Sequence, residues 1–416
     1  MNSFGSAPTG AQGSATRPVR AARVALCLMA MCLVPALAFL ASCSSDGGDP
    51  TFTDPPTPPT QDWIFDVTGT AADNVYACGA KGAMFHFDGA AWSPVAMGTS
   101  DAIVRMWKED AGSTLYAVGH KGHIWTNTGA AWVGMNSGTG QNLYGIGALG
   151  GVVHAVGQDG TICRLAGSTW SQVAGSMFLL NENNVPTDTL QVAEDIASLV
   201  TVNNYFLGGA YVDPDYTGTR FGVFGTRGMV LAPNTDPLYE GEWILRPLSG
   251  EQIVPHEWVL CTTSDPAILS RNLLGTSEGW LFKLTRDDNG KNVWQKFYPS
   301  LTVDPGSGIN DIWLDAAGNA YLVTDEGQLV YQTVNYDYSS ATGKRVVLYD
   351  NVDRLTTVWG TGPDNLWFAG FREGTIFHGV HNQANDQFTL TSTTVTFPDK
   401  GAAGLMTTDH LGRPLN

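Results

Sequence analysis

Few residue patterns in this chain have the spacing that metal binding or catalysis requires. His120 and His123 flank a Lys-Gly turn, but zinc needs three or four ligands and no third one is near. Two acidic groups, at 213–215 and 287–289, carry oxygens that suit Ca²⁺, although neither has the spaced oxygen series of an EF-hand. We therefore predict surface turns at these places and no catalytic site, with Ca²⁺ left open as the one candidate cofactor.

The elements that would position a site come from an internal repeat. Seven copies share a small residue or Gly, two or three spacers, a Gly, and two or three apolar residues. The second Gly of the copies stands at positions 82, 122, 160, 228, 279, 327 and 374. Most of the steps between these glycines fall near the period of about 40–50 residues that is typical of four-stranded propeller blades.

Each repeat also has the grammar of four short strands. In the first copy the β-type runs cover 64–69, 74–79, 83–87 and 92–95, with turn residues between them. The second and third residues after the Gly are apolar in nearly every copy, so both faces of each sheet must be covered. The sequence therefore predicts an all-β fold, a seven-bladed β-propeller of four-stranded antiparallel blades.

Several of these units resemble a known group of repeats. Leu115-Tyr116-Ala117-Val118-Gly119 with Gly129-Ala130-Ala131-Trp132, and Leu366-Trp367-Phe368-Ala369-Gly370 with Gly374-Thr375-Ile376-Phe377, are similar to WD/YVTN/BNR-like propeller repeats of bacterial secreted proteins and lipoproteins. The resemblance covers about residues 62–396. It implies the fold and leaves the ligand open, because propellers of this group have many roles.

The N-terminus has the pattern of a targeting segment. Three arginines precede an apolar run at 24–40, which leads into Leu40-Ala41-Ser42-Cys43. This tetrapeptide resembles the lipobox of bacterial lipoproteins. The resemblance implies that residues 1–42 are a signal peptide, that Cys43 carries palmitate-type acyl chains, and that the protein is anchored in the cell envelope. Ser44 in place of Asp favours the outer membrane, with the domain facing either the periplasm or the surface.

The remaining boundaries follow from composition. Residues 43–61 are rich in Ser, Asp, Gly and Pro, and we predict a tether that forms no core. The propeller is expected over 62–400, and 401–416 is either a loose tail or a closure strand. Three further cysteines, Cys78, Cys163 and Cys261, lie in apolar strand contexts and are predicted to be buried thiols.

Net charge limits the partners. The chain has 39 acidic and 22 basic residues; three of the basic residues and no acidic one precede Cys43, so the mature chain has 39 against 19, a net charge of −20. This charge argues against nucleic acid and against electrostatic docking on anionic lipid, so membrane contact is expected through the anchor alone. We also expect a monomer.

Function is predicted from where the repeat is enlarged. The middle of the chain has insertions, and insertions in propellers fall on one rim, where binding sites are often built. The residues predicted for this binding rim are Asp213, Asp215, Tyr216, Asp287, Asp288, Tyr336 and Tyr338. The main hypothesis is a non-enzymatic binding or scaffold module for an envelope protein or polysaccharide. Two alternatives stay open: a sialidase-like or lyase-like enzyme with an arginine cluster and a Tyr/Glu pair on the axis, and an outer-membrane assembly factor.

Overall fold

The structure is a computed structural model. It describes the segments 61–109, 112–149, 152–158, 161–172, 177–179, 205–211, 220–225, 229–233, 243–247, 259–263, 271–286, 292–297, 307–336 and 342–398, together with Ile268 and Met406. Between 177 and 247 the backbone of the strands is described without side chains. All of these residues belong to one compact unit, Thr57–Asn416. The predicted signal peptide and most of the predicted tether and tail lie outside the described residues.

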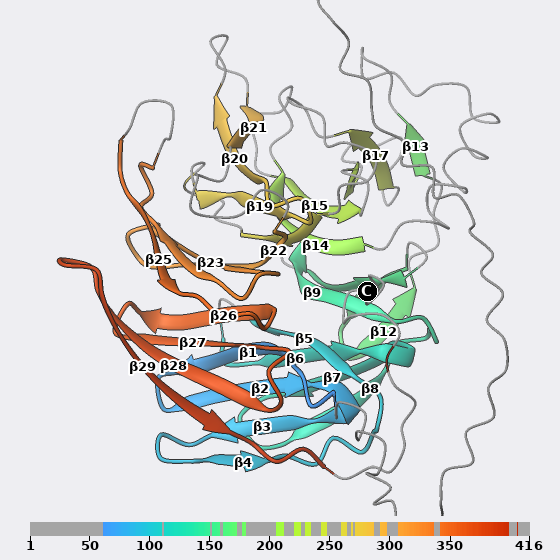
Figure 1. The fold of residues 1–416 in the computed structure, drawn as a ribbon. Helices are drawn as coiled ribbons and strands as arrows, with labels where there is room; N and C mark the ends of the chain where they lie inside the picture. The colour runs from blue at the N-terminus through green and yellow to red at the C-terminus, as the bar shows by residue number, and fades with distance from the viewer. Residues whose placement is uncertain are drawn as a thin grey trace, which may run out of the picture. The chain divides into compact units, whose positions relative to one another are not determined.

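Three consecutive four-stranded sheets begin the described chain (Figure 1). Sheet 1 contains β1 (Ile64–Ala71), β2 (Asn74–Gly79), β3 (Met84–Phe87) and β4 (Trp92–Pro94). Sheet 2 contains β5 (Ile103–Lys108), β6 (Leu115–Gly119), β7 (His123–Asn127) and β8 (Trp132–Asn136). Sheet 3 contains β9 (Leu143–Leu149), β10 (Val152–Gly157), β11 (Ile162–Ala166) and β12 (Thr169–Gln172).

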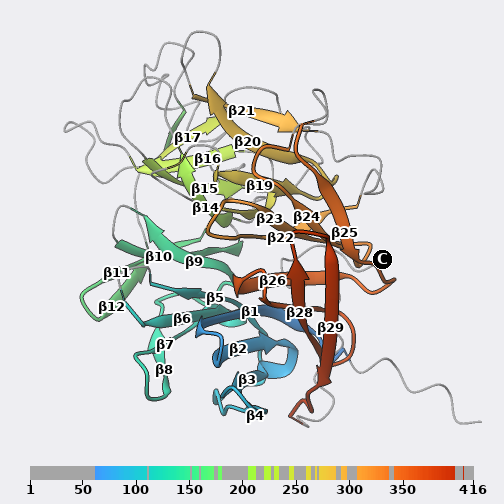
Figure 2. The same cartoon turned by 90° about the vertical axis from the view of Figure 1, so that its left-hand side faces the viewer.

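Three further sheets of the same kind follow later in the chain (Figure 2). Sheet 5 contains β18 (Val259–Thr262), β19 (Leu273–Thr276), β20 (Leu281–Arg286) and β21 (Asn292–Phe297). Sheet 6 contains β22 (Ile309–Leu314), β23 (Ala320–Thr324), β24 (Leu329–Gln332) and β25 (Arg345–Tyr349). Sheet 7 contains β26 (Leu355–Gly362), β27 (Asn365–Gly370), β28 (Thr375–Asn382) and β29 (Gln387–Thr394). In all six sheets the strands are in sequence order and pair antiparallel.

Sheet 4 differs, and it corrects the prediction. It contains β13 (Met177–Leu179), β14 (Tyr205–Tyr211), β15 (Arg220–Gly225), β16 (Met229–Pro233) and β17 (Trp243–Pro247), in the order β13-β17-β16-β15-β14. β13 pairs parallel to β17. The expectation of seven four-stranded antiparallel blades is therefore wrong: six sheets have that form. The physical reason is that β13, at the start of residues 177–191, which the sequence indicates as one of the insertions in the middle of the chain, supplies a fifth strand.

The sheets are joined through their first strands. Each first strand contacts the first strand of the next sheet, in the order β1, β5, β9, β14, β18, β22 and β26, and β26 contacts β1 again. The ring therefore closes by non-covalent contact between sheet 7 and sheet 1, which we call the seam. No described sheet mixes strands from the two ends of the chain.

The core lies between neighbouring sheets, as the repeat predicts. The apolar pairs after the turn glycine are buried, including Met84 and Phe85 at 1% exposure and Leu329 and Val330 at 0%. One cluster of buried residues extends across the seam, from Phe65 in β1 to Ala369 and Ile376 in sheet 7. Burial on both faces explains why the strands show little alternation of apolar and polar residues.

Contacts outside the strands also hold the seam. The rings of Trp63 and Phe371 stack with centroids 4.3 Å apart. The side-chain amide of Gln61 donates to the carbonyl of Met406 (3.1 Å) and accepts from its backbone N–H (2.7 Å). Met406 also packs against the apolar cluster at the seam. The one described residue of the predicted tail is thus bonded to the entrance of the propeller.

The turn glycine of the repeat is required by its backbone and by its neighbour. Gly122 has φ +73°, and a Cβ there would lie 2.1 Å from the carbonyl oxygen of Thr139, in the connection to the next sheet. The same positive φ and a carbonyl at 2.3 to 2.5 Å, from the segment that follows the fourth strand, recur at the equivalent glycines 82, 279, 327 and 374. The repeat therefore keeps Gly here because a side chain would push away the segment that follows the fourth strand.

Replacing this glycine should destabilise the fold measurably. Gly122→Ala adds a Cβ in a left-handed conformation and against the Thr139 carbonyl, so we expect the free energy of unfolding to fall by about 1–3 kcal/mol in denaturant titrations. Gly140→Ala is the matched control, since a Cβ at that position would meet no atom within 4 Å and its φ is not positive. Equal stability of the two variants would contradict this account of the repeat.

Candidate functional site: an axial cluster and a loop edge

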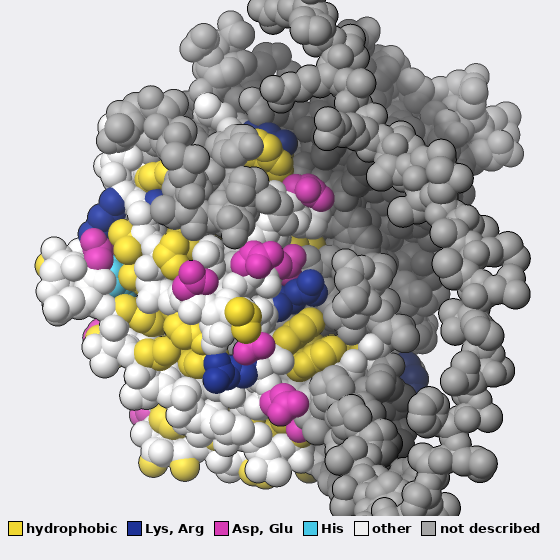
Figure 3. Space-filling model, in the orientation of Figure 1, with side chains coloured by type: hydrophobic (Ala, Val, Ile, Leu, Met, Phe, Trp, Pro, Cys, Tyr) yellow, Lys and Arg dark blue, Asp and Glu magenta, His cyan; other side chains and the backbone are white. Residues whose placement is uncertain are grey.

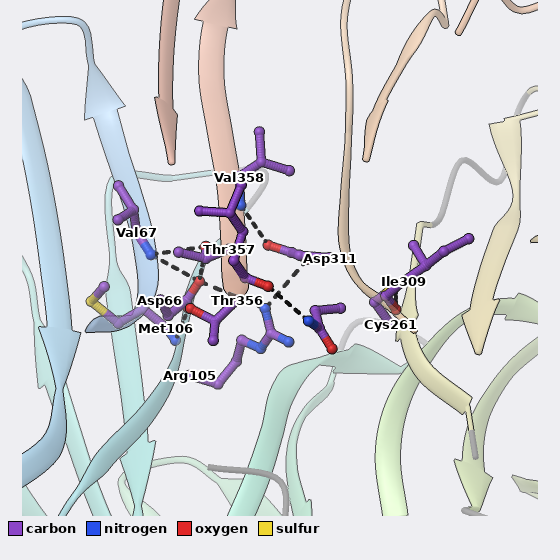
Figure 4. A network of polar contacts seen from close by, with 12 residues as sticks. Asp66, Val67, Arg105, Met106, Cys261, Ile309, Asp311, Thr356, Thr357 and Val358 are labelled. Carbon is purple, nitrogen blue, oxygen red and sulfur yellow. Dashed lines mark hydrogen bonds and ion pairs between the residues drawn. The ribbon is translucent and has the colours of Figure 1, made fainter. Parts of the chain in front are cut away.

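In four of the first strands the third residue points toward the axis of the ring. In sheets 1, 2, 6 and 7 these positions hold Asp66, Arg105, Asp311 and Thr357, which we call the axial cluster (Figure 4). Sheets 2 and 6 are not neighbours, yet the Arg105 Nη1 lies 3.4 Å from the Asp311 Oδ1. Such a contact is made only if both side chains face the common centre.

A repeated backbone irregularity produces this orientation. The pairing between first and second strands shifts register just before the third residue, at Asp66, Arg105, Asp311 and Thr357, and also at Cys261 in β18. A bulge of this kind re-aims a side chain and leaves backbone groups without a ladder partner. In this fold it turns the third side chain inward and frees the N–H of the fourth residue.

The Asp66 carboxylate uses those freed groups. Its Oδ2 accepts a hydrogen bond from the backbone N–H of Met106 in sheet 2 (2.5 Å). Its Oδ1 accepts from the hydroxyl of Thr357 in sheet 7 (3.0 Å) and from the N–H of Val67 in its own strand (3.0 Å). One buried carboxylate thus joins three consecutive sheets.

The same bond recurs at the next two contacts between sheets. The Asp311 Oδ2 accepts from the N–H of Val358 in sheet 7 (3.0 Å), and the Thr357 hydroxyl accepts from the N–H of Val67 in sheet 1 (3.1 Å). In each case the third residue of one first strand bonds to the fourth residue of the next. We call these contacts the cross-sheet bonds.

A second layer of bonds runs beside them. The side-chain amide of Asn310 donates to the carbonyl of Leu355 (2.7 Å), and the Thr356 hydroxyl donates to the carbonyl of Ile64 (2.7 Å). Both donors are the second residue of a first strand, and both acceptors are the first residue of the next. The polar contacts therefore gather on the two interfaces that flank sheet 7, including the seam.

Arg105 lies between the two carboxylates. Its Nη1 is 3.6 Å from the Asp66 Oδ1 and 3.4 Å from the Asp311 Oδ1. Burial disfavours its charge, but Asp311 and Asp66 outweigh burial and raise the pKa of Arg105. Burial raises the pKa of Asp66 to about 6, against the opposing effect of Arg105, and burial also raises the pKa of Asp311. The cluster is thus a buried guanidinium shared by two carboxyl groups, one of which, that of Asp66, has a pKa of about 6.

A carboxyl group with a pKa near 6 resembles a general acid in its proton affinity. Its hydrogen bonds suggest a different use, since both oxygens of Asp66 already accept from groups of the fold. The described residues also give no group of three or more His, Cys, Asp or Glu side chains that could hold a metal ion. The arrangement is suited to holding sheets together.

The arginines do not form the cluster that a sialidase-like site would need, as far as their side chains are described. Arg164 is exposed on β11, Arg271 donates to the carbonyl of Ala316 (2.6 Å), and Arg372 lies 3.9 Å from Asp353. Only Arg105 stands on the axis among the described arginines. The side chains of Arg220, Arg227 and Arg246 lie outside the described residues.

The predicted binding rim is described at one residue. Tyr336 lies after β24, and the Arg345 guanidinium stands 5.9 Å from its ring centroid. The Arg345 Nε and Nη2 are buried and have no hydrogen-bond partner among the described residues. Burial lowers the pKa of Arg345 to about 10, and Tyr336 opposes this shift. Asp213, Asp215, Tyr216, Asp287, Asp288 and Tyr338 lie outside the described residues.

The other predicted chemical groups have structural partners. The His123 Nε2 lies 3.1 Å from Asp101, which also pairs with Lys121 at 2.8 Å. The predicted buried thiols are confirmed: Cys78, Cys163 and Cys261 are free and buried. Burial raises the pKa of Cys163 to about 11, which keeps this thiol protonated.

Sequence reasoning missed most of the axial cluster and one short motif. Asp66 and Asp311 stand in apolar strand runs, Ile-Phe-Asp-Val and Asn-Asp-Ile-Trp, and a charge at one repeat register of a buried strand is the signal that could have found them. Gly275-Thr276-Ser277-Glu278-Gly279 has the letters of a nucleophile elbow. It connects strands β19 and β20, whereas the elbow connects a strand to a helix.

The fold is read from the ring of sheets, and comparison with known proteins adds no argument to it. The chain has a β-propeller fold. Similar solved structures are YCF48 from Cyanidioschyzon merolae (15% identity, TM-score 0.47, 75% of this chain and 94% of that one) and the WD40 propeller domain of Doa1 (11%, 0.47, 75% and 90%). A protein of Bacteroides uniformis, provisionally described as a 6-phosphogluconolactonase, is similar at 16% identity and a TM-score of 0.46, over 80% of this chain and 97% of that one. At these values the likenesses carry no information on ligand or activity.

No protein-family model matches the chain, and no curated protein sequence is significantly similar to it.

The raised pKa of Asp66 gives a pH test of the cluster. The folded state binds this proton with a pKa of about 6, above the ordinary value of 3.8. The resulting stability is present below about pH 4 and is lost as pH rises to about 6. We therefore expect the unfolding free energy of the wild type, relative to Asp66→Asn, to fall between pH 4 and 6 and then level off.

Asp88→Asn is the control for this experiment. Asp88 is exposed, and the backbone N–H groups of Ala91 and Ala90 lower its pKa, so its contribution is lost as pH falls. Unfolding titrations across the pH range measure both differences. A wild-type advantage over Asp66→Asn that is constant or grows with pH would contradict the assignment of a raised pKa to Asp66.

Proposed function

We propose that this chain is a lipid-anchored cell-envelope propeller that acts as a non-enzymatic binding or scaffold module for an envelope protein or polysaccharide. The observation that carries the proposal is the use of the axial polar groups. The side-chain oxygens of Asp66, Asp311 and Thr357 accept hydrogen bonds from backbone N–H groups of neighbouring sheets. The described part of the axis therefore serves the ring, and ligand binding is assigned to its outer surfaces.

The strand order favours one edge of the sheets, meaning one end of their strands, as the binding rim. The connections β14–β15, β20–β21 and β24–β25 each lead from a first to a second strand or from a third to a fourth strand of their sheets. In antiparallel sheets with this order, both kinds of connection leave from the same edge. These are the connections that contain the predicted rim residues.

Charge on the described surface fits a partner held by mixed contacts. Acidic and basic side chains lie near one another on the face in Figure 3, with hydrophobic side chains between them. At the proposed rim, Lys344 in the β24–β25 connection pairs with Asp386 in the β28–β29 connection (2.6 Å). Paired charges of both signs favour specific docking over binding to a uniformly charged polymer.

The binding rim can be tested by substitution. The full mature chain is used to retain proteins and glycans from envelope extract, beside Tyr336→Ala and a variant with the 287–291 connection shortened. We expect both changes to lower the retained partner at least about tenfold, which corresponds to the loss of roughly 1.4 kcal/mol of binding free energy. The amount retained is measured by mass spectrometry.

Glu373→Ala is the control for the rim, because Glu373 is exposed in the turn between β27 and β28, on the opposite edge of the sheets. It should retain the partner like the wild type. Equal retention by all variants would move the site away from the proposed rim. Turnover of an envelope glycan would replace the binding-module proposal with an enzymatic one.

The anchor is tested separately from the binding rim. Cys43→Ser removes the thiol that would carry the acyl chains, so we expect loss of radiolabelled palmitate from the protein and its release from the membrane fraction. Cys27→Ser, within the predicted signal peptide, should keep both the palmitate label and the association with the membrane fraction. Among the described residues no helix is long and apolar enough to cross a membrane. Membrane retention of Cys43→Ser would contradict the lipid anchor.

A further inference from the structure

The outer strand of sheet 7 is unusual among the outer strands. β29 is eight residues long, whereas β4, β8, β12 and β25 have three to five and β21 has six. It is the last strand of its sheet, and no other described strand pairs with its outer side. It lies along the left border of the fold in Figure 1 and on the side that faces the viewer in Figure 2.

β29 also lacks the features that protect exposed strand edges. Such edges are usually blocked by charge, proline, a bulge or shortness. The sequence of β29, Gln-Phe-Thr-Leu-Thr-Ser-Thr-Thr, has no charge and no proline, and its pairing with β28 runs through eight residue pairs without a register shift. Other outer strands carry Pro94, Arg345 or Lys296. Among the described residues, this edge therefore has neither a pairing strand nor a feature that would block one.

The hydrogen bonds to β28 show which groups face outward. The N–H of Val395 donates to the carbonyl of Gly374, so this pair is a hydrogen-bonded one in the ladder. Alternate residues of an antiparallel strand turn their backbone groups to opposite sides. The backbone N–H and C=O groups that face the free edge are consequently those of Phe388, Leu390, Ser392 and Thr394.

We propose that two copies of this chain associate by antiparallel pairing of β29 with β29 of the second copy, about a two-fold axis at Thr391. In this register the edge-facing residues pair with one another, Phe388 with Thr394 and Leu390 with Ser392 of the second copy. All four outward residues of each strand then gain a partner. The two sheets become one continuous eight-stranded sheet.

The side chains of β29 suit a second copy of themselves. Thr391 meets its own counterpart at the axis, and Thr389 meets Thr393 on the same exposed face. Cross-strand threonine pairs stabilise sheets, and no like charges oppose each other within this strand. A two-fold contact of this kind is closed, so it produces a dimer and no fibre. The net charge of each copy opposes association at low salt, and the uncharged edge is where two copies can approach most closely.

This inference goes beyond the proposed function, and it replaces the expectation of a monomer. The proposed dimer contact is made by β29, whereas the predicted binding rim lies in other connections. A dimer would place two binding rims on one assembly and raise the effective concentration of each for a repeated partner. Loss of partner binding and loss of dimerisation are thus separable results.

A cysteine at the axis tests the register. Residues opposite each other at Thr391 form a non-hydrogen-bonded pair with Cα atoms about 4.5 Å apart, within the range that a disulfide spans. Thr391→Cys in the full chain should give a disulfide-linked dimer under mild oxidation. Thr393→Cys is the matched control, because two copies of residue 393 are about 13 Å apart in this register, given about 3.3 Å per residue. The wild-type chain, oxidised in the same way, measures the background of disulfide linkage through the native cysteines.

A charge exchange tests association without a covalent bond. Thr391→Lys and Thr391→Glu each bring like charges together at the axis, so each alone should be monomeric by native mass spectrometry, and an equal mixture should form the mixed dimer. Ser171→Lys, exposed on β12, should remain dimeric like the wild type. Circular dichroism checks that each variant is folded. A monomeric wild type, equal crosslinking at 391 and 393, or dimers of Thr391→Lys would each overturn the proposal.

Discussion

A single carboxylate, that of Asp66, bonds to three consecutive sheets of a ring that has no covalent closure. The chain enters at sheet 1 and leaves at sheet 7, so nothing but side-chain and backbone contacts stops these two sheets from separating. The cross-sheet bonds of Asp311, Thr357 and Asp66 follow one another through sheets 6, 7, 1 and 2. Polar bonds inside a water-poor centre are directional, so they fix the register between sheets that apolar packing alone would leave adjustable.

The charged groups at the centre of the ring are unfavourable to bury. Two carboxyl groups share one guanidinium, and burial makes it unfavourable to ionise both. A proton held by Asp66 relieves this repulsion and leaves its acceptor role to the remaining lone pairs. Because these polar groups are committed to structure, loops and outer strands can vary without disturbing the ring.

Much of the fold could be predicted from the residues. The strands of the first repeat and the burial of Met84 and Phe85 follow from turn residues and from apolar runs, because both signals are local. Sheet 4 could not be predicted in its form, because the parallel pairing of β13 with β17 joins segments that are far apart in sequence and share no local signal. The axial cluster was missed for a related reason: Asp66 and Arg105 look like ordinary strand charges until the ring brings them together with Asp311. The rim residues Asp213, Asp287 and Tyr338 remain predictions.

The clasp of Gln61 on Met406 has a topological consequence. Since the two residues share two hydrogen bonds, the points where the chain enters and leaves the ring are adjacent in space. Residue 61 could be joined to residue 406 by a short peptide, and new ends could be opened in the connection between β8 and β9. Such a circular permutant would keep every sheet intact. The seam between sheets 7 and 1 would then be crossed by a continuous chain, and the interface between sheets 2 and 3 would be held by non-covalent contacts alone.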